Sequence, residues 1–229
     1  MVNIDTVYQK VLNFASKEQR GYITPQEFNL FANQAQKEIF EQYFYDTNQF
    51  NRVPGNDTVY ADVDDMLEEK MQIFQEQEVW NINSNMQSIG DVYRIYRLQL
   101  QGGGVCEILR TKDYNDAVMG GPLTRPSITR PIANIRNNTL RVSDGGNTNI
   151  INALVFYFRA PVNPTWDYFV VSGKALYNSN QSVDFELHPA EEVELVYKIL
   201  KYAGVSMQRD DIMKVGQGLD SLQVQQEKQ

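Results

Sequence analysis

The first third of the chain carries hydrophobic residues at helical spacing. A helix is predicted over residues 4–16 from the positions of Ile4, Val7, Tyr8, Val11, Leu12 and Ala15. The segment from Thr24 to Glu27 is a capping box with Pro25 at the first helical position, so a long helix is predicted over residues 25–45. A third helix is predicted over residues 58–78, with a buried stripe of Val59, Val63, Met66, Leu67 and Phe74.

The middle of the chain changes from helical spacing to short β-branched and aromatic runs. Strands are predicted over residues 91–100 and 105–111, joined tightly by three glycines at 102–104. Pro122, Pro126 and Pro131 exclude a helix from the segment that follows. Further strands are predicted over residues 133–136, 138–142 and 153–160, with a turn at Gly145 before the last. Together these runs predict a small antiparallel sheet or sandwich.

The last part of the chain returns to helix. Residues 189–203 begin with Pro189, carry glutamates near the start and lysines near the end, and precede Gly204, which is predicted to stop the helix. A shorter helix is predicted from Asp210 onward, with a seam spaced 3, 4, 3 that resembles a coiled coil and is a candidate contact for a neighbouring protein. Its residues are Ile212, Val215, Leu219 and Leu222.

This order of helices, strands and helices predicts an α+β fold. The simplest architecture is a helical bundle made by the N- and C-terminal helices, with a central antiparallel β-sheet or sandwich as an insertion. The predicted parts are an N-terminal helical part (residues 1–90), a β domain (91–184), and a C-terminal helix with a polar tail (185–229) that packs with the N-terminal helices.

Charge is distributed unevenly along the 229 residues, which sum to a net charge of −8. Residues 1–90 hold 6 Lys and Arg against 14 Asp and Glu, whereas residues 91–160 hold 9 basic against 5 acidic residues. An acidic first half is unlike a nucleic-acid clamp. The basic middle suits either an acidic neighbouring subunit or a mixed solvated surface.

The candidates for chemistry are few. His188, the single histidine, precedes Pro189 and is interpreted as a cap; Cys106, the single cysteine, is interpreted as a small buried residue, with a Cys–His dyad as the alternative. One residue of each kind is too few for a zinc site. We therefore predict no catalytic residue, metal or cofactor, and a protein that is not an enzyme.

An acidic group in the third predicted helix resembles a carboxylate cluster of the kind that binds calcium. It lacks the glycine and the downstream glutamate of a calcium loop, so a solvated helix face is the interpretation. Its members are Asp62, Asp64, Asp65, Glu68 and Glu69. The N-terminus does not have the pattern of a signal peptide, and no run reaches the roughly 18–20 apolar residues of a membrane span. A single cysteine permits no intrachain disulfide, which fits assembly in a reducing cytoplasm.

Across residues 18–215, several segments in a fixed order resemble structural proteins of podovirus-type tailed bacteriophages, including crAss-like phages. The segments are Gly21 to Asn29, Asp91 to Arg94, Pro122 to Pro126, Asn138 to Val142, Tyr157 to Pro161, Asn163 to Trp166, and Val183 to Gly204. The family they resemble is that of the head–tail connector proteins, also called adaptor or ring proteins.

This resemblance implies a virion protein that forms a homo-oligomeric ring, commonly of twelve copies, beneath the portal protein. Such a ring extends the DNA channel, offers a docking surface to other tail or ring proteins, and lets genomic DNA pass without sequence-specific binding. It implies assembly in the host cytoplasm, location at the head–tail junction, and no membrane partner. Another tail ring, a tail-tube component, and an interaction or scaffold module without a ring stay open as alternatives.

Charge then suggests two roles within such a ring. The acidic group from Asp62 to Glu69 would line the channel and repel phosphate. The acidic helical half of one subunit would meet the arginines of the next in a head-to-tail contact that closes into a ring. These candidate contact residues are Arg94, Arg97, Arg125, Arg130, Arg136 and Arg141.

Overall fold

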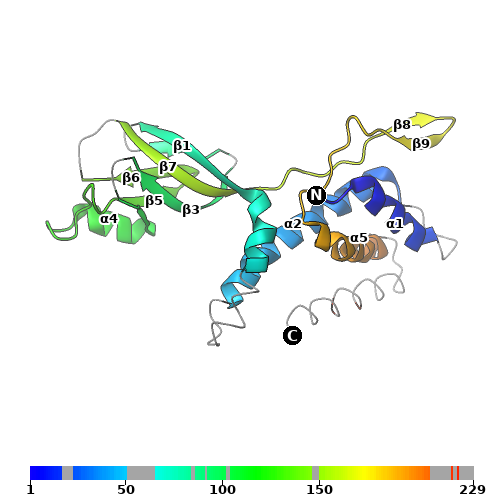
Figure 1. Ribbon diagram of the computed structural model, residues 1–229, viewed down its shortest axis with the longest axis horizontal. Coiled ribbons are helices and arrows are strands. Elements are labelled where there is room, and N and C mark those ends of the chain that lie inside the picture. Colours follow the sequence, from blue (N-terminus) through cyan, green and yellow to red (C-terminus); the bar gives the residue numbers. More distant parts are fainter. Residues whose placement is uncertain are drawn as a thin grey trace. The chain divides into compact units, whose positions relative to one another are not determined.

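The computed structural model of the protein (Figure 1) describes residues 1–16, 23–50, 65–83, 86–90, 92–101, 104–145 and 150–206, together with residues 218 and 221. The chain divides into two compact units. A helical unit comprises Met1–Ile73 and Pro161–Gln229, and a β unit comprises Phe74–Ala160. The fold is therefore α+β with a central sheet, as the order of patterns in the sequence predicts.

The described part of the helical unit includes α1 (Ile4–Ser16), α2 (Pro25–Phe50), a helix over residues 65–71, and α5 (Glu192–Ser206), the last of which follows a 3-10 turn, η2 (Pro189–Glu191). Both α1 and α2 pack against α5 (Figure 1). Their apolar faces form the core of this unit, which includes Val7, Val11, Phe28, Ala32, Ile39, Leu195, Ile199 and Ala203. Helices from the two ends of the chain thus pack together, because each buries one face against the other.

Local signals in the sequence fix where these helices begin. The Thr24 hydroxyl accepts a hydrogen bond from the backbone N–H of Glu27 at 3.3 Å, and the Glu27 carboxylate accepts one from the backbone N–H of Thr24 at 3.0 Å. This reciprocal pair confirms the capping box. The pKa of Glu27 is lowered because the Thr24 N–H and the Thr24 hydroxyl both donate hydrogen bonds to its carboxylate. The end of α5 differs from the prediction. Gly204 is buried inside the helix, which continues to Ser206, so packing overrides the local tendency of glycine to stop a helix.

The third predicted helix, over residues 58–78, is wrong from residue 72 onward, and its residues 58–64 lie outside the described part of the chain. Residues 65–71 are helical and lead through a 3-10 turn, η1 (Gln72–Phe74), into strand β1 (Gln75–Asn83). Strand β1 pairs with β7 (Ile150–Arg159) over nine consecutive residues. That ladder decides the conformation of a segment whose own sequence is compatible with either state. The β unit consequently begins at Phe74 and not at residue 91.

The β unit contains one seven-stranded sheet in the order β3-β7-β1-β2-β6-β5-β4. Its other strands are β2 (Met86–Ser88), β3 (Val92–Leu100), β4 (Glu107–Ile108), β5 (Ile132–Arg136) and β6 (Thr139–Ser143). Every pairing is antiparallel except that of β4 with β5. The core lies on one face and includes Ile82, Leu98, Leu140, Val142, Ala153 and Val155.

The sheet curls until its two edges meet. The Cys106 N–H donates to the Leu98 carbonyl at 2.8 Å, and Gln99 pairs with Val105, while the next residues of the chain form β4 at the opposite edge. The predicted strand over 105–111 is therefore reduced to a bridge and a two-residue strand. Helix α4 (Thr111–Met119), which the sequence did not predict, follows directly. This closure encloses the core on the concave face.

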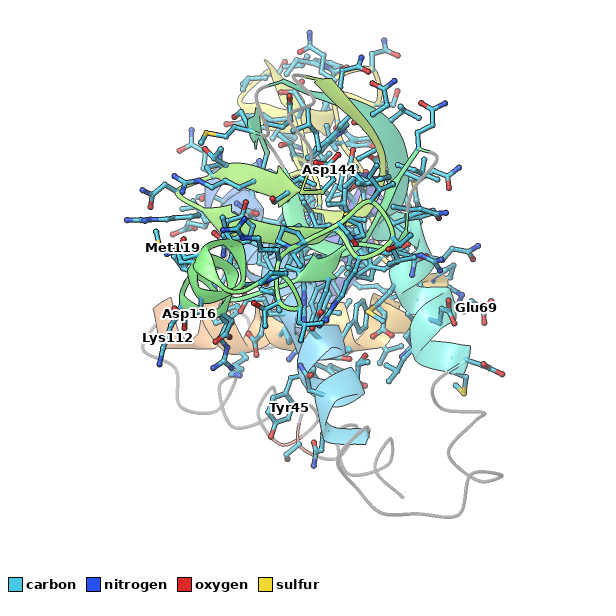
Figure 2. All side chains as sticks on the ribbon, turned by 90° about the vertical axis from the view of Figure 1, so that its left-hand side faces the viewer. Tyr45, Glu69, Lys112, Asp116, Met119 and Asp144 are labelled. Atoms are coloured by element: carbon cyan, nitrogen blue, oxygen red, sulfur yellow. The ribbon has the colours of Figure 1, made fainter. Side chains whose placement is uncertain are left out.

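Helix α4 covers part of the outer face of the sheet, near β5 and β6. The Asn134 side chain donates to the Leu109 carbonyl at 2.9 Å just before the helix begins. Burial raises the pKa of Tyr114 on α4, and the nearby charge of Arg141 on β6 opposes that rise. Figure 2 shows Lys112, Asp116 and Met119, all on this helix. The outer face at β3, β7 and β1 has no such cover from α4.

Residues 161–184, which were predicted to belong to the β domain, belong to the helical unit. Within them β8 (Tyr168–Val171) and β9 (Lys174–Tyr177) form a separate two-stranded hairpin. Figure 1 shows this hairpin extending beyond α1, α2 and α5. The flanking chain is tied to α2, since the Gln36 amide donates to the Val162 carbonyl at 2.8 Å and accepts the Glu186 N–H at 3.0 Å.

Candidate interaction surfaces

The hairpin β8–β9 is anchored at its base by Trp166. This side chain is 2% exposed, its indole N–H donates to the Asp5 carboxylate at 2.9 Å, and its ring lies against Tyr8 with centroids 4.4 Å apart. On its other side it stacks with Tyr168 and Tyr177, each at 5.7 Å between ring centroids. The base of the hairpin is therefore held by aromatic contacts to the helical unit.

The tip of the same hairpin is apolar and open to solvent. Ser172 and Gly173 form its two-residue turn with φ of 51° and 75°, the backbone that tight hairpins require. Around this turn lie the exposed side chains of Phe169, Val170, Val171 and Leu176, with Val170 at 66%. Each of β8 and β9 pairs only with the other among the described strands, so both outer edges lack a backbone partner strand. Such an edge invites pairing or docking by another chain.

A second exposed surface is the outer face of β1, β7 and β3. The register places Gln77, Phe156 and Arg97 in one row across these strands. The row on one side of it contains Gln75, Phe158 and Arg94, and the row on the other side contains Val79, Leu154 and Gln99. Tyr96 is displaced at a bulge and packs on Phe158 at 4.9 Å between centroids. We call these nine residues and Tyr96 the outer aromatic face.

The six candidate arginines do not form one cluster. Arg94 and Arg97 lie together on the outer aromatic face, and both are exposed. Arg136 ends β5, and Arg141 is half-buried on β6, where its charge affects Tyr114 of α4. Two further arginines lie in the loop after α4. There the Arg125 guanidinium donates to the Gly120 carbonyl, and Arg130 lies 3.8 Å from Glu107 in an exposed pair.

The acidic candidates that the structure describes are Asp65, Glu68 and Glu69, all exposed on the helix of residues 65–71. Asp62 and Asp64 lie outside the described residues, as do Ile212, Val215, Leu219 and Leu222 of the predicted seam. Figure 2 shows Glu69 on its short helix. Met66, which was predicted to be buried, is 59% exposed beside these carboxylates, because Leu67 and Met71 are the residues that face the core.

A buried ionic cluster joins α2 to α5. The ammonium of Lys198, whose side chain is 3% exposed, lies 3.1 Å from the Glu38 carboxylate and 3.3 Å from that of Glu194. Tyr202 donates a hydrogen bond to Glu38. Burial alone would raise the pKa of Glu38, but this hydrogen bond and the charges of Lys198 and Lys201 bring it below its ordinary value. Burial and then the bond to Glu38 raise the pKa of Tyr202 to about 12.

Beside this cluster lies a small cavity of about 30 Å³, which is room for about one water molecule. Lys70 and Glu191 line it with their charged atoms 2.6 Å apart, and the other lining residues are Ile39, Gln42, Tyr43, Asp46, Leu67 and Glu194. The cavity is too small for a substrate. The Lys70–Glu191 pair links the helix of residues 65–71 to η2, beside the packed side chains of α2 and α5.

His188 and Cys106 have structural roles. His188 begins the 3-10 turn before α5, and its Nδ1 accepts the Ala190 N–H at 3.3 Å, as its predicted capping role requires. Cys106 is buried in the core of the β unit. Burial and then the charge of Asp144 raise the pKa of its thiol to about 12, so it is protonated at neutral pH. The described geometry gives neither residue the setting of an activated nucleophile.

Among the described residues, no helix combines the length and apolarity needed to cross a membrane. Nor do those residues contain a group of three or more His, Cys, Asp or Glu side chains placed to hold a metal ion. Comparison with models of known protein families and with curated proteins found no match. The function is therefore inferred from the exposed surfaces.

Sequence reasoning missed both apolar surfaces. For the hairpin a signal was present, since the run from Tyr168 to Val171 is followed by Ser172 and Gly173, a pair suited to a two-residue turn. For the outer aromatic face the signal was incomplete. The alternation along β7 shows two faces, but only the pairing with β1 and β3 shows which of them is enclosed.

Proposed function

We propose that this chain is a structural virion protein that assembles into an oligomeric ring in the head–tail connector of a tailed bacteriophage, extending the DNA channel between portal and tail. The ring has twelve copies in this proposal, with the portal protein and other tail or ring proteins as neighbours. The ordered resemblance over residues 18–215 motivates it. The observation that carries it is the exposed apolar hairpin β8–β9.

An exposed apolar hairpin supports an assembly function for a physical reason. A two-stranded hairpin is only marginally stable in water on its own, and this one is fixed to the helical unit at its base alone. Its tip leaves four large apolar side chains in solvent, which is a cost unless another surface covers them. A subunit that docks on its neighbours through this hairpin removes that surface and both open strand edges from water.

Two further surfaces of opposite charge also support a ring. The acidic helix of residues 65–71 and the arginines of β3 lie on different units and carry opposite charge. A contact between unlike surfaces of identical chains is heterologous, and it closes into a ring when its rotation is suitable. Inside the helical unit, in contrast, the charges of Lys198, Glu38 and Glu194 pair with one another and join α2 to α5.

The test is to measure assembly of the full chain and its location in virus particles. Light scattering and electron microscopy should show a ring of one defined size, either alone or on the portal protein of the same phage. The variant Val170→Asp should reduce assembly by at least about tenfold, because it places a charge in an apolar contact. Leu30→Asp is the matched control, since Leu30 is exposed to a similar extent, at 69%, on α2.

Two results together would refute the ring. The first is a chain that stays monomeric at every concentration, with and without the portal protein. The second is its absence from purified particles by mass spectrometry. If the wild-type chain assembles but Val170→Asp and Leu30→Asp affect assembly equally, the hairpin is not part of the contact.

A further inference from the structure

We propose that the outer aromatic face of β1, β7 and β3 docks the acidic helix of residues 65–71 from a second copy of this chain. This inference rests on the proposed ring function and names the contact that would build the ring. It joins the β unit of one subunit to the helical unit of the next. Asp65 and Glu69 would then lie in a subunit contact and not on the channel wall.

The outer aromatic face has an apolar centre and a basic edge. Its apolar side chains are Val79 and Tyr96, which are 63% and 44% exposed, Leu154 and Phe156, which are half-buried, and Phe158, which is buried at 8% and packs against Tyr96. Its charges are two arginines on β3. The described outward positions of these three strands carry no carboxylate, because Glu76 and Glu78 lie on the opposite face, where they pair with Tyr157 and Trp80.

One of the two arginines is already positioned by an aromatic side chain. The Arg97 guanidinium lies 5.9 Å from the centroid of Phe156, and Arg94 stands in the adjacent row beside Phe158. Successive outward positions of a strand are about 7 Å apart. A cation that rests on an aromatic ring loses little freedom on binding, so this edge is prepared for a carboxylate partner.

The helix of residues 65–71 offers the matching pattern. Asp65 and Glu69 are one helical turn apart, with about 5–6 Å between their Cβ atoms, which matches the spacing of the two arginine rows. Met66 is exposed next to them and supplies an adaptable apolar side chain for the centre of the face. Leu67 and Met71 are buried, and Lys70 pairs with Glu191 at 2.6 Å, so the rotation of the helix is fixed.

A second copy is favoured over nucleic acid by the chemistry of this face. Phosphates would satisfy Arg94 and Arg97 but would leave the apolar centre in water, whereas the acidic helix brings both carboxylates and Met66. The chain also has a net charge of −8, which opposes binding to a polyanion. Because the two surfaces differ, each subunit uses both of them, and the contact repeats around a ring.

A charge-swap series on the full chain tests this contact by sedimentation velocity, alone and on the portal protein. Arg94→Glu/Arg97→Glu and Asp65→Arg/Glu69→Arg should each weaken assembly at least about tenfold, because like charges then face each other. The chain that carries all four substitutions should regain assembly. Arg110→Glu/Lys112→Glu is the matched control, with the same change of charge at exposed residues of the same unit but away from the face, and it should assemble as the wild type does. Circular dichroism checks that every variant is folded.

The outcomes separate the contact from the ring itself. If the face variant assembles like the wild type, or if the fourfold variant assembles no better than either double variant, the contact is overturned while the ring function stands. A wild-type chain that stays monomeric in both settings overturns both. Salt-dependent binding of a labelled single-stranded oligonucleotide that is lost in Arg94→Glu/Arg97→Glu, with assembly unchanged, assigns the face to nucleic acid and overturns the contact.

Discussion

Lys198 should be a main determinant of the stability of the helical unit. Its ammonium lies between two carboxylates, Glu38 at 3.1 Å and Glu194 at 3.3 Å, and the side chains of Lys198 and Glu194 are only 3% and 4% exposed. The substitution Lys198→Met keeps most of the side-chain volume but removes the positive charge. Glu194 is then a buried carboxylate that has lost its nearest cation, a change that typically costs about 3–5 kcal/mol.

That cost is large against the roughly 5–15 kcal/mol that holds a folded domain together. With a denaturant dependence of about 2 kcal/mol per molar urea, the unfolding midpoint should fall by roughly 1.5–2.5 M. The measurement uses tryptophan fluorescence in a Trp80→Phe background, since the chain has two tryptophans and the remaining one, Trp166, lies in the helical unit. The fluorescence then reports the unfolding of that unit.

Lys201→Met is the matched control for Lys198→Met. Lys201 approaches the same carboxylate, Glu38, but at 3.9 Å and from a side chain that is 27% exposed. Its loss should cost below about 1 kcal/mol, as for other solvent-exposed pairs. Adding Glu194→Gln to Lys198→Met should recover part of the loss, because it removes the buried negative charge. Equal unfolding midpoints for Lys198→Met and Lys201→Met would refute this account of the cluster.

The same cluster predicts that the stability of the folded chain depends on pH in the acidic range. The pKa of Glu38 is below its ordinary value of 4.5 in the folded state, so its ionised form favours folding. That contribution is present above about pH 4.5 and is lost as the pH falls through the lower folded-state pKa. The free energy of unfolding of the wild type should therefore decline more steeply below pH 4.5 than that of Glu38→Gln. Parallel curves for the two proteins would contradict the prediction.

Three further tests concern a tight turn of the β unit, the thiol of Cys106 and the anchor of the hairpin β8–β9. Gly145→Ala should destabilise the β unit by about 1–3 kcal/mol in thermal unfolding, since φ is +76° and the added Cβ would meet the Pro126 carbonyl oxygen at 2.1 Å. Gly173→Ala, with a similar φ but no atom within 4 Å, should cost only about 1 kcal/mol, and equal losses would argue against the steric cause. Cys106 should resist iodoacetamide at pH 8 in the folded chain and react readily in urea, because burial keeps its thiol protonated; equal rates would contradict its burial. Trp166→Phe removes the 2.9 Å hydrogen bond to Asp5 and should cost about 1–3 kcal/mol and speed hydrogen exchange in β8–β9, whereas unchanged exchange would show that the hairpin does not depend on this anchor.

The sequence by itself determined the helices with strong local signals. The helix at residues 4–16 and the start of α2 at Pro25 lie where spacing and the capping box put them. The fold class was predicted correctly for the same reason, since helical spacing at both ends and β-branched runs between them are visible without any tertiary contact. His188 was also interpreted correctly, because a residue before Pro189 at a helix start has a local role.

Only the tertiary structure decided the elements whose partners are far away in the chain. Residues 75–78 were predicted to be helical and are strand, because β1 pairs with a strand that begins 75 residues later. The nine-residue α4, none of whose residues is buried, was also missed. The boundaries of the β unit differ from the predicted ones for the same reason, because strand pairing and not the local sequence pattern defines them.

The two candidate interaction surfaces likewise depend on the tertiary structure and not on the sequence alone. The sequence contains every residue of the outer aromatic face, but β7 alternates Leu154, Val155, Phe156 and Tyr157 with apolar residues on both sides. Nothing local tells which side is enclosed. The curl of the sheet decides it by enclosing Val155 and Tyr157 in the core and leaving the row of Phe156 outside. Burial is a property of the whole fold, so exposed apolar surface is something that the tertiary structure alone determines.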